Sequence, residues 1–336
     1  MTTSRTATVG PAVTPAARMP RVTAFLSRHR EVLRLVLIVA VLWLVLSILS
    51  PRFFTVANLS NVLINAAPLA LAAAGLTIVI IAGELDLSVG SIVALVSTAS
   101  GLLMIATGVA WPIALVLGVC VGVLCGLLNG LIVALIGVPS FITTLAMMGA
   151  FRGIALVISD GKAVSGLPAG LTELASTRVF GLPVILVIPV IAIPVLGFLL
   201  SKTTFGLNVY AIGGNREAAR IAGVPIARTR ILVLLISGAM AGLGGAIMTA
   251  RLGVGSPIIA DSLAMDAIAA VVIGGTSLFG GVGRIGGTVM GVLLVASIQN
   301  GLVLLNVSAF YQQIVVGVVL VVAVAIDAVS KRRRNA

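Results

Sequence analysis

Long apolar runs constrain this chain more than any other feature. Ten segments approach the roughly 20 apolar residues that a helix needs to cross the hydrocarbon core of a bilayer. Only 9% of the residues are charged, whereas about a quarter are charged in a soluble domain. The sequence therefore predicts an all-α polytopic membrane protein of about ten transmembrane helices. The expected spans are 33–50, 62–82, 87–107, 110–136, 139–158, 182–200, 231–250, 262–279, 286–304 and 310–330.

The positions of the basic residues predict the orientation of these spans. Lys and Arg accumulate in the cytoplasmic segments of membrane proteins, and an even number of spans places both termini there. All but five of the 21 Lys and Arg residues then fall on the cytoplasmic side, the exceptions being Arg52, Arg152, Lys162, Arg178 and Arg251. We expect a disordered basic region at 1–32, a membrane domain at 33–330 and a basic tail at 331–336.

Several kinds of chemistry lack a motif in this sequence. There is no GxxxxGK[ST] loop for ATP, no HExxH and no GxSxG. A His/Cys metal site is not expected, because the chain has one His and two Cys that share a single span. The +12 net charge does not indicate nucleic-acid binding, because the basic residues lie at the termini and in one loop. We expect neither an enzyme nor a cofactor bound by this chain.

Two of the nine acidic residues interrupt an apolar region in the segment "GELDLSVG", residues 83–90. Charge is costly within hydrocarbon, so Glu84 and Asp86 mark a break between two spans. We favour a capping role, in which Asp86 or Ser88 accepts hydrogen bonds from the first turn of a helix that starts near Val89. Acidic groups at a helix N-terminus also gain about 0.3–1 kcal/mol. The alternative is that this break lines a central pathway.

Small residues predict close packing of the helices. Gly118, Gly122, Gly126 and Gly130 recur at every fourth residue and form a ridge on which a second helix packs closely. The spacing leaves open whether that helix belongs to the same chain or to another copy.

The long polar loop 201–230 contains "NREAARIAGVP", residues 215–225. It predicts a short helix with Arg216, Glu217 and Arg220 on its polar side, ended by Gly223 and Pro225. Such a helix either docks a partner or lies at the membrane surface without one, and its spacing does not separate these two interpretations.

This loop resembles the EAA coupling helix of bacterial ATP-binding-cassette importer permeases, although no I-x-L-P follows it. Together with "GELDLSVGSIVAL", "VPSFITTLAMM" and "AVVIGGTSLFGGVGRIGGT", it is similar to the ribose/xylose/galactose-type monosaccharide permease family over residues 55–328. Glu84 is a departure, because members of that family often have a second glycine there.

The resemblance implies a homodimer in the bacterial inner membrane, a cytoplasmic ATPase that holds ATP and Mg²⁺, and an extracytoplasmic sugar-binding protein. It places the loop helix in the ATPase, with Asn215, Arg216, Glu217, Ala218, Ala219, Arg220 and Gly223 as coupling residues. It also places the family's acidic stretch on Gly83, Asp86, Leu87, Ser88, Gly90 and Ser91. With the departing Glu84, the residues that we expect at the helix break and pathway are Gly83, Glu84, Asp86, Ser88 and Gly90.

Uncharged polar residues within the spans suit a neutral hydroxylated solute, and Phe141 is placed to stack on a sugar ring. For each single residue, an interhelical hydrogen bond of about 0.6 kcal/mol is the simpler interpretation. The pathway candidates are Asn61, Asn65, Thr77, Asn129, Phe141, Thr143, Thr144 and Gln299.

We therefore expect a permease subunit for a monosaccharide, a pentose or a related sugar. The alternatives are a permease for nucleosides or branched-chain amino acids, or an ion-coupled secondary carrier. The carrier is disfavoured because five of the spans contain no acidic residue. A structural or enzymatic membrane protein would carry no solute flux.

Overall fold

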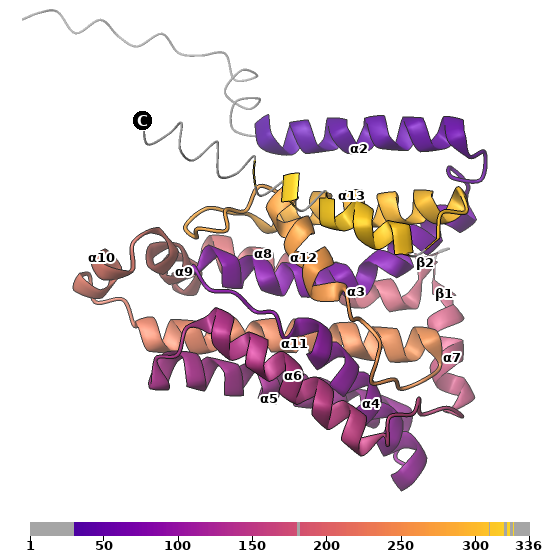
Figure 1. The fold of residues 1–336 in the computed structure, drawn as a ribbon, viewed down its shortest axis with the longest axis horizontal. Coiled ribbons are helices and arrows are strands. Elements are labelled where there is room, and N and C mark those ends of the chain that lie inside the picture. The colour runs from indigo at the N-terminus through magenta and orange to yellow at the C-terminus, as the bar shows by residue number, and fades with distance from the viewer. Residues whose placement is uncertain (1–29, 180–181, 309, 319–320, 323–324, 326–336) are drawn as a thin grey trace, which may run out of the picture.

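The computed structural model describes residues 30–179, 182–308, 310–318, 321–322 and 325. The predicted tail 331–336, almost all of the region 1–32 and part of the span 310–330 lie outside these residues. Long helices run side by side between the two ends of the molecule (Figure 1). They are α2 (Arg30–Leu49), α3 (Val56–Ile81), α4 (Val89–Thr107), α5 (Trp111–Leu131), α6 (Ser140–Ile158), α8 (Val187–Lys202), α11 (Ile226–Leu252) and α13 (Ile285–Leu304).

Shorter elements complete the fold. The helices α7 (Ala169–Ser176), α9 (Thr204–Gly214), α10 (Arg216–Ile221) and α12 (Leu263–Ile273) join the long ones. A π-helical turn, η1 (Ile132–Ile136), continues α5, and a 3₁₀ turn, η2 (Val184–Leu186), precedes α8. The strands β1 (Arg178–Val179) and β2 (Leu182–Pro183) form one small antiparallel pair.

The described residues contain seven helices that are long and apolar enough to span a membrane. The chain is therefore an all-α polytopic membrane protein, but the predicted count of ten is not confirmed. The apolar part of α2 covers 17 residues, Leu33–Leu49. The expected span 262–279 contains only the 11-residue helix α12, which rises about 16 Å. This helix stops where Gly275 adopts a φ of 87°.

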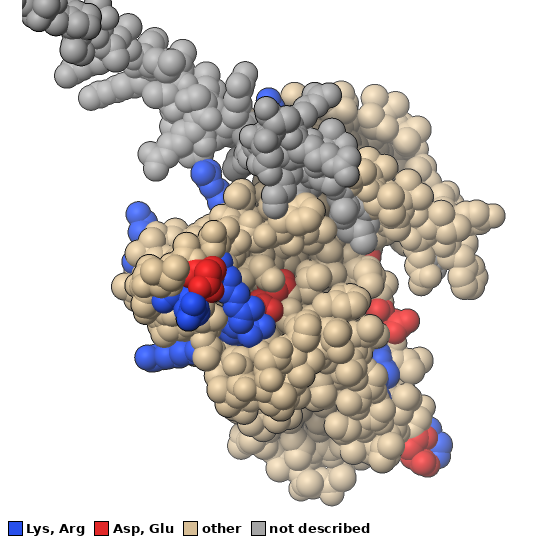
Figure 2. Space-filling view, turned by 60° about the vertical axis from the view of Figure 1, so that its left-hand side comes forward, with Lys and Arg blue, Asp and Glu red and all other residues tan. Residues whose placement is uncertain are grey.

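The two ends of the molecule differ in their elements and charges. Helices α9 and α10 lie at one end, and α7 with the β1–β2 pair lies at the other (Figure 1). Figure 2 shows charged side chains gathered mainly at the α9–α10 end, while the wide surface between the ends carries few. That surface is apolar, with exposed side chains such as Leu37, Val157, Val190 and Phe198. This belt is the surface that lipid would cover.

Helix α11 lies at the centre and packs against α5 through glycine. A Cβ atom at Gly122 would lie 2.8 Å from the carbonyl oxygen of Gly238, and one at Gly126 would lie 3.0 Å from the Cα of Gly238. The predicted tight packing of the glycine ridge is therefore confirmed. Gly122, Gly126 and Gly130 pack against α11 of the same chain, and Gly118 packs against Val96 and Ser100 of α4.

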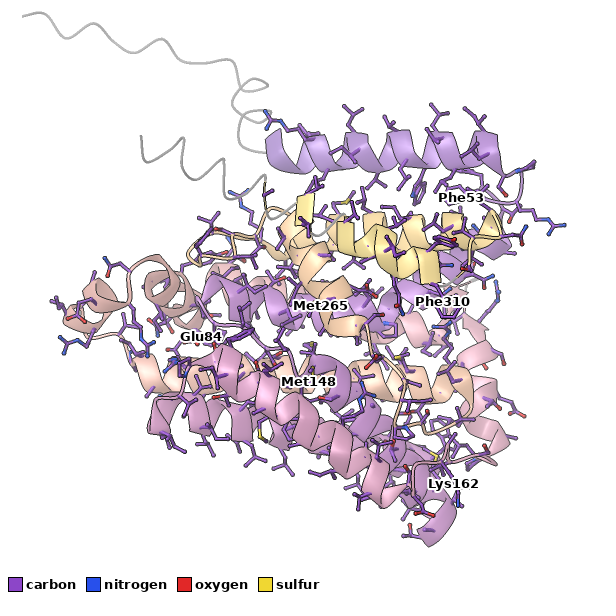
Figure 3. All side chains as sticks on the ribbon, viewed as in Figure 1. Phe53, Glu84, Met148, Lys162, Met265 and Phe310 are labelled. Carbon is purple, nitrogen blue, oxygen red and sulfur yellow. The ribbon has the colours of Figure 1, made fainter. Side chains whose placement is uncertain are left out.

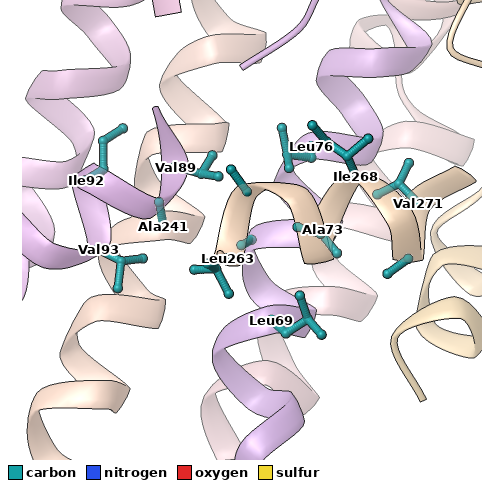
Figure 4. Packing of buried hydrophobic residues seen from close by; sticks show 14 of the residues in the cluster. Leu69, Ala73, Leu76, Val89, Ile92, Val93, Ala241, Leu263, Ile268 and Val271 are labelled. Atoms are coloured by element: carbon teal, nitrogen blue, oxygen red, sulfur yellow. The ribbon is translucent and has the colours of Figure 1, made fainter. Parts of the chain in front are cut away.

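Alanine and larger aliphatic side chains fill the remaining interior. Figure 4 shows buried residues of α3, α4, α11 and α12 meeting in one cluster, including Leu76, Ile92, Ala241 and Ile268. This packing holds the short helix α12 against α3 and α4, so α12 is an interior element of the bundle.

Candidate functional site

The predicted helix break is present between α3 and α4. Helix α3 ends at Ile81 and α4 begins at Val89; we call residues 82–88 the break segment. Gly83 turns the chain with a φ of 74°, a value that favours glycine. The segment then runs from the α9–α10 end toward the middle of the molecule, where α4 begins (Figure 1).

Side chains of α6 satisfy the backbone of the break segment. The N–H of Leu85 donates to Ser140 Oγ at 3.0 Å, and the N–H of Leu87 donates to Thr144 Oγ1 at 3.1 Å. The hydroxyl of Thr144 donates in turn to the carbonyl of Leu85 at 3.2 Å. A non-helical backbone inside a membrane protein needs such partners, because lipid offers none.

The carboxylate of Asp86 organises the start of α4. It is fully buried and accepts hydrogen bonds from Ser88 N (2.9 Å), Ser88 Oγ (2.6 Å) and Ser237 Oγ (2.7 Å). Ser88 occupies the N-cap position of α4, but its side chain makes no capping hydrogen bond within the described structure. The predicted capping by Asp86 or Ser88 is therefore only partly confirmed. Asp86 accepts the N–H of the N-cap residue Ser88 itself, and the Ser88 hydroxyl donates to Asp86 and accepts nothing from the first turn of α4.

Glu84 forms a buried ion pair that the sequence did not indicate. Its Oε1 accepts a hydrogen bond from Nε of Arg230, with both side chains 7% exposed or less. Nη1 of Arg230 also donates to the carbonyl of Val133 in the π-helical turn at 2.8 Å. Glu84 lies toward the α9–α10 end, whereas the exposed Lys162 lies at the opposite end (Figure 3).

The predicted loop helix is present as α10. Asn215 caps it, with Oδ1 accepting the N–H of Ala218 at 2.9 Å, and Ala219 is buried beneath it. The exposed Arg220 donates to both carboxylate oxygens of Glu217. This contact lowers the pKa of Glu217 and raises that of Arg220. The structure places the helix where we expected it, and its role in coupling stays a prediction.

A glycine contact joins the base of α10 to the break segment. The N–H of Gly281 donates to the carbonyl of Ile81, the last residue of α3, at 2.8 Å. A Cβ atom at Gly213, near the end of α9, would overlap that same carbonyl oxygen. Gly280 packs against both Gly213 and Gly83. Three backbone segments therefore meet where only glycine fits.

The start of α4 also meets the loop before α12. A Cβ atom at Gly90 would lie 2.5 Å from the carbonyl oxygen of Ala260, so Gly90 allows the two backbones to touch. The first turns of α4 and α12 consequently lie together inside the bundle, an arrangement that interrupted helices adopt in transporters.

The predicted pathway residues do not form one site. Asn129 and Thr144 are buried and support the break segment, since Asn129 Nδ2 donates to Ser88 Oγ at 2.9 Å. Thr143 is buried as well, and its hydroxyl has no partner among the described residues. Asn61, Asn65 and Phe141 are instead exposed on the outside of the chain.

The two remaining pathway candidates have interhelical partners. The hydroxyls of Thr77 and Thr288 are 2.6 Å apart, and Gln299 donates to Asp266 at 3.2 Å. Within the described residues, no group of three His, Cys, Asp or Glu side chains is placed to hold a metal ion.

Sequence reasoning missed three residues that support the site. Arg230, Ser140 and Ser237 hold the break segment from α11 and α6. Arg230 directly precedes the apolar run "ILVLL", and a cation so close to an apolar span is a signal that it needs a buried partner.

Comparisons with known proteins agree with this architecture. Residues 58–324 match the family described as branched-chain amino acid transport system / permease component. The chain is 45% identical over 289 residues to the ribose import permease of Bacillus subtilis (strain 168), which covers 85% of this chain and 89% of that protein. No solved structure matches the chain.

Two further relatives are permeases of Escherichia coli (strain K12). The L-arabinose transport system permease is 37% identical over 301 residues, covering 90% of this chain and 92% of its own. The xylose transport system permease is 36% identical over 342 residues, which cover 84% of this chain and 87% of that permease. By its fold and its relatives, the chain is a transport permease, a polytopic helical bundle with an interrupted helix. The chain belongs to the transport-system permease component family.

Proposed function

We propose that this chain is the membrane-spanning subunit of an ATP-driven importer that carries a monosaccharide, a pentose or a related sugar, across the bacterial inner membrane. The observation that carries this proposal is the 45% identity, over 85% of the chain, to a permease named for ribose import. Relatives named for L-arabinose and xylose, at 37% and 36% identity, support the same substrate class.

The family description names branched-chain amino acids, which would be the second candidate substrate. A zwitterion needs charged partners in the pathway. Among the described residues, the buried Glu84 and Arg230 pair with each other, and Asp86 is satisfied by hydroxyl and amide donors. These buried charges are occupied, which favours a neutral solute.

The finer topology is part of the proposal. The α9–α10 end would face the cytoplasm, because Arg and Lys collect there (Figure 2). Ten spans would then include α2, α12 and a last helix of which residues 310–318 are described. Both chain termini would be cytoplasmic.

The partners that we propose are those of ATP-binding-cassette importer permeases, and the orientation sets the side of the membrane on which each would bind. A cytoplasmic ATPase that binds ATP and Mg²⁺ would contact α10 and its ends through Asn215, Arg216, Glu217, Ala218, Arg220 and Gly223. The expected coupling residue Ala219 is buried, so it would support α10 from inside the permease. A second copy of the chain and an external sugar-binding protein would complete the importer.

The test is uptake of labelled pentoses, hexoses, nucleosides and branched-chain amino acids by a strain that lacks this gene. The wild-type chain should restore uptake of one sugar. Glu217→Arg should reach the membrane in normal amounts and fail, because it replaces the acidic residue of α10 with a third arginine. Lys202→Glu is the matched control, an exposed charge reversal at the same end of the molecule but outside α10, and it should transport normally.

Two outcomes would contradict this proposal. Equal uptake by wild type and Glu217→Arg would remove the coupling role of α10. Uptake that survives ATP depletion and collapses with an uncoupler would support an ion-coupled carrier instead.

A further inference from the structure

Arg230 joins three parts of the chain that are far apart in sequence. It lies in the first two turns of α11, and its guanidinium bonds to Glu84 in the break segment, 146 residues away. It also donates to the carbonyl of Val133, 97 residues away, in the π-helical turn that follows α5. π-Helical turns often mark functional sites.

Stability alone does not explain a buried pair of this kind. Removing two charges from water is costly, and well-packed apolar side chains of similar volume are often as stabilising or more so. Glu84 and Arg230 are 7% and 5% exposed. Fixing the position of the break segment relative to α11 and the π-helical turn would account for two buried charges here.

The connection between α10 and Arg230 is short and stiff. Only residues 222–225 separate α10 from α11. Val224 N donates to the carbonyl of Ala219 in α10 at 3.0 Å, and both the N–H and the hydroxyl of Thr229 bond to the carbonyl of Pro225 at 3.0 Å. A displacement of α10 must therefore move the first turn of α11 with it.

Arg230 is also reachable from the surface that carries α10. A hollow of about 580 Å³ is lined by Arg216, Glu217, Arg220, Val224, Ala134, Ile226, Ala227 and Arg230. The exposed charges of α10 and the buried guanidinium thus border one space.

The Glu84–Arg230 pair lies close in sequence to the residues that hold the start of α4. Arg230 and Ser237 are two turns apart on one face of α11, and they hold Glu84 and Asp86, which are two residues apart in the break segment. Asp86 in turn binds the N–H and hydroxyl of Ser88, directly before α4. One face of α11 therefore contacts the break segment through two side chains, Arg230 and Ser237.

We propose that Arg230 is a positioning residue, and that its contact with Glu84 transmits movement of α10 to the break segment and α4. The inference rests on the proposed function, because it needs a partner that moves α10. Ser237 would act as the second grip, so that α11 and the break segment move as one body.

The test compares variants of the complete importer, reconstituted in vesicles with its ATPase and binding protein. We would measure the amount of assembled permease and the ATP hydrolysed per sugar carried. Arg230→Met leaves the Glu84 carboxylate buried without a partner, so less permease should assemble. The double variant Glu84→Leu/Arg230→Met should recover the amount, because an apolar pair packs well. It should nevertheless hydrolyse at least tenfold more ATP per sugar than the wild type.

Arg228→Met is the matched control, an exposed arginine of the same helical turn, and its ATP per sugar should equal that of the wild type. If the double variant recovers both amount and coupling, the pair is only structural and the inference fails, while the proposed function stands. If the wild type itself carries sugar without ATP hydrolysis, the proposed function and this inference both fail.

A second measurement needs no variant. Hydrogen exchange of the wild-type importer with and without a non-hydrolysable ATP analogue reports which segments change together. We expect protection to change in residues 216–230 and in residues 82–90. A change confined to residues 216–230 would overturn the inference.

Discussion

The hydroxyl of Ser237 donates a 2.7 Å hydrogen bond to the carboxylate of Asp86, 151 residues earlier in the chain. Both residues are fully buried. The bond joins the middle of α11 to the break segment between α3 and α4. Helix α11 and the break segment therefore share a polar contact inside an apolar bundle.

Asp86→Ala should destabilise the permease strongly. The carboxylate accepts three hydrogen bonds, and a buried donor left without a partner costs about 1–3 kcal/mol. We expect the midpoint of thermal unfolding in detergent to fall markedly. Asp86→Asn keeps one acceptor oxygen and should lower the midpoint less. Glu173→Ala, at an exposed position in α7, should leave the midpoint unchanged. A midpoint of Asp86→Ala equal to that of the wild type would show that these hydrogen bonds do not stabilise the fold.

Gly126→Ala should separate α5 from α11. The added methyl group would overlap the carbonyl oxygen of Leu234 and meet the Cα of Gly238 at 3.0 Å, and a backbone cannot move aside as a side chain does. We expect Gly126→Ala to lower the midpoint of thermal unfolding in detergent. Gly153→Ala is the matched control in α6, because no described atom lies within 4 Å of its added Cβ. There, alanine should be neutral or stabilise the helix by up to about 1 kcal/mol. Similar effects at both positions would contradict the packing argument.

Gly213→Ala and Gly214→Ala should differ sharply although they are neighbours. At Gly213 the methyl group would overlap the carbonyl of Ile81, whereas at Gly214 no described atom lies within 4 Å. We expect Gly213→Ala to lower the amount of folded permease, measured by size-exclusion chromatography of the detergent extract. Gly214→Ala should elute like the wild type. If both elute normally, the contact of Gly213 with Ile81 and Gly281 adjusts more easily than the structure indicates.

The pH dependence of ATPase binding should reflect Glu217. The Arg220 guanidinium lowers the pKa of this carboxyl below its usual value, which is about 4.3. A lowered pKa means that the ion pair is complete above the usual value and is lost only as pH falls through the lower one. We therefore expect binding of the ATPase to permease in nanodiscs to be constant from about pH 8 to pH 5. Arg220→Gln should make binding decline at a higher pH. An unchanged profile would show that the charge of Glu217 does not contribute to binding of the ATPase.

Much of the fold was predictable from the sequence, because a backbone in lipid must satisfy its own hydrogen bonds and helices do so within one segment. The span 262–279 shows the limit of that rule. Its residues are apolar, yet the helix ends at Ile273, where two consecutive glycines allow the chain to turn. Hydropathy measures the solvent that a segment prefers, and it does not report where a backbone leaves the helix.

The site was predictable in its location and less so in its contacts. Glu84 and Asp86 correctly marked a discontinuity, because charge needs a reason to lie near hydrocarbon. Arg230 as the partner of Glu84 followed from no local pattern, since the packing of α11 brings them together across 146 residues. Asn129 and Thr144 illustrate the same difficulty. Their residue type predicted polar contacts, and the structure gives these to the break segment.

The break segment also has a consequence for how the protein is made. All the side chains described as holding it belong to residues that the ribosome synthesises later: Asn129, Ser140, Thr144, Arg230 and Ser237. The first interrupted helix therefore enters the membrane before its partners exist. It has to wait, shielded by water, lipid headgroups or the insertion machinery, until α11 arrives. Closure of the break segment is thus a late step in the biogenesis of this permease, and chains truncated before α11 are the ones that cellular quality control should remove.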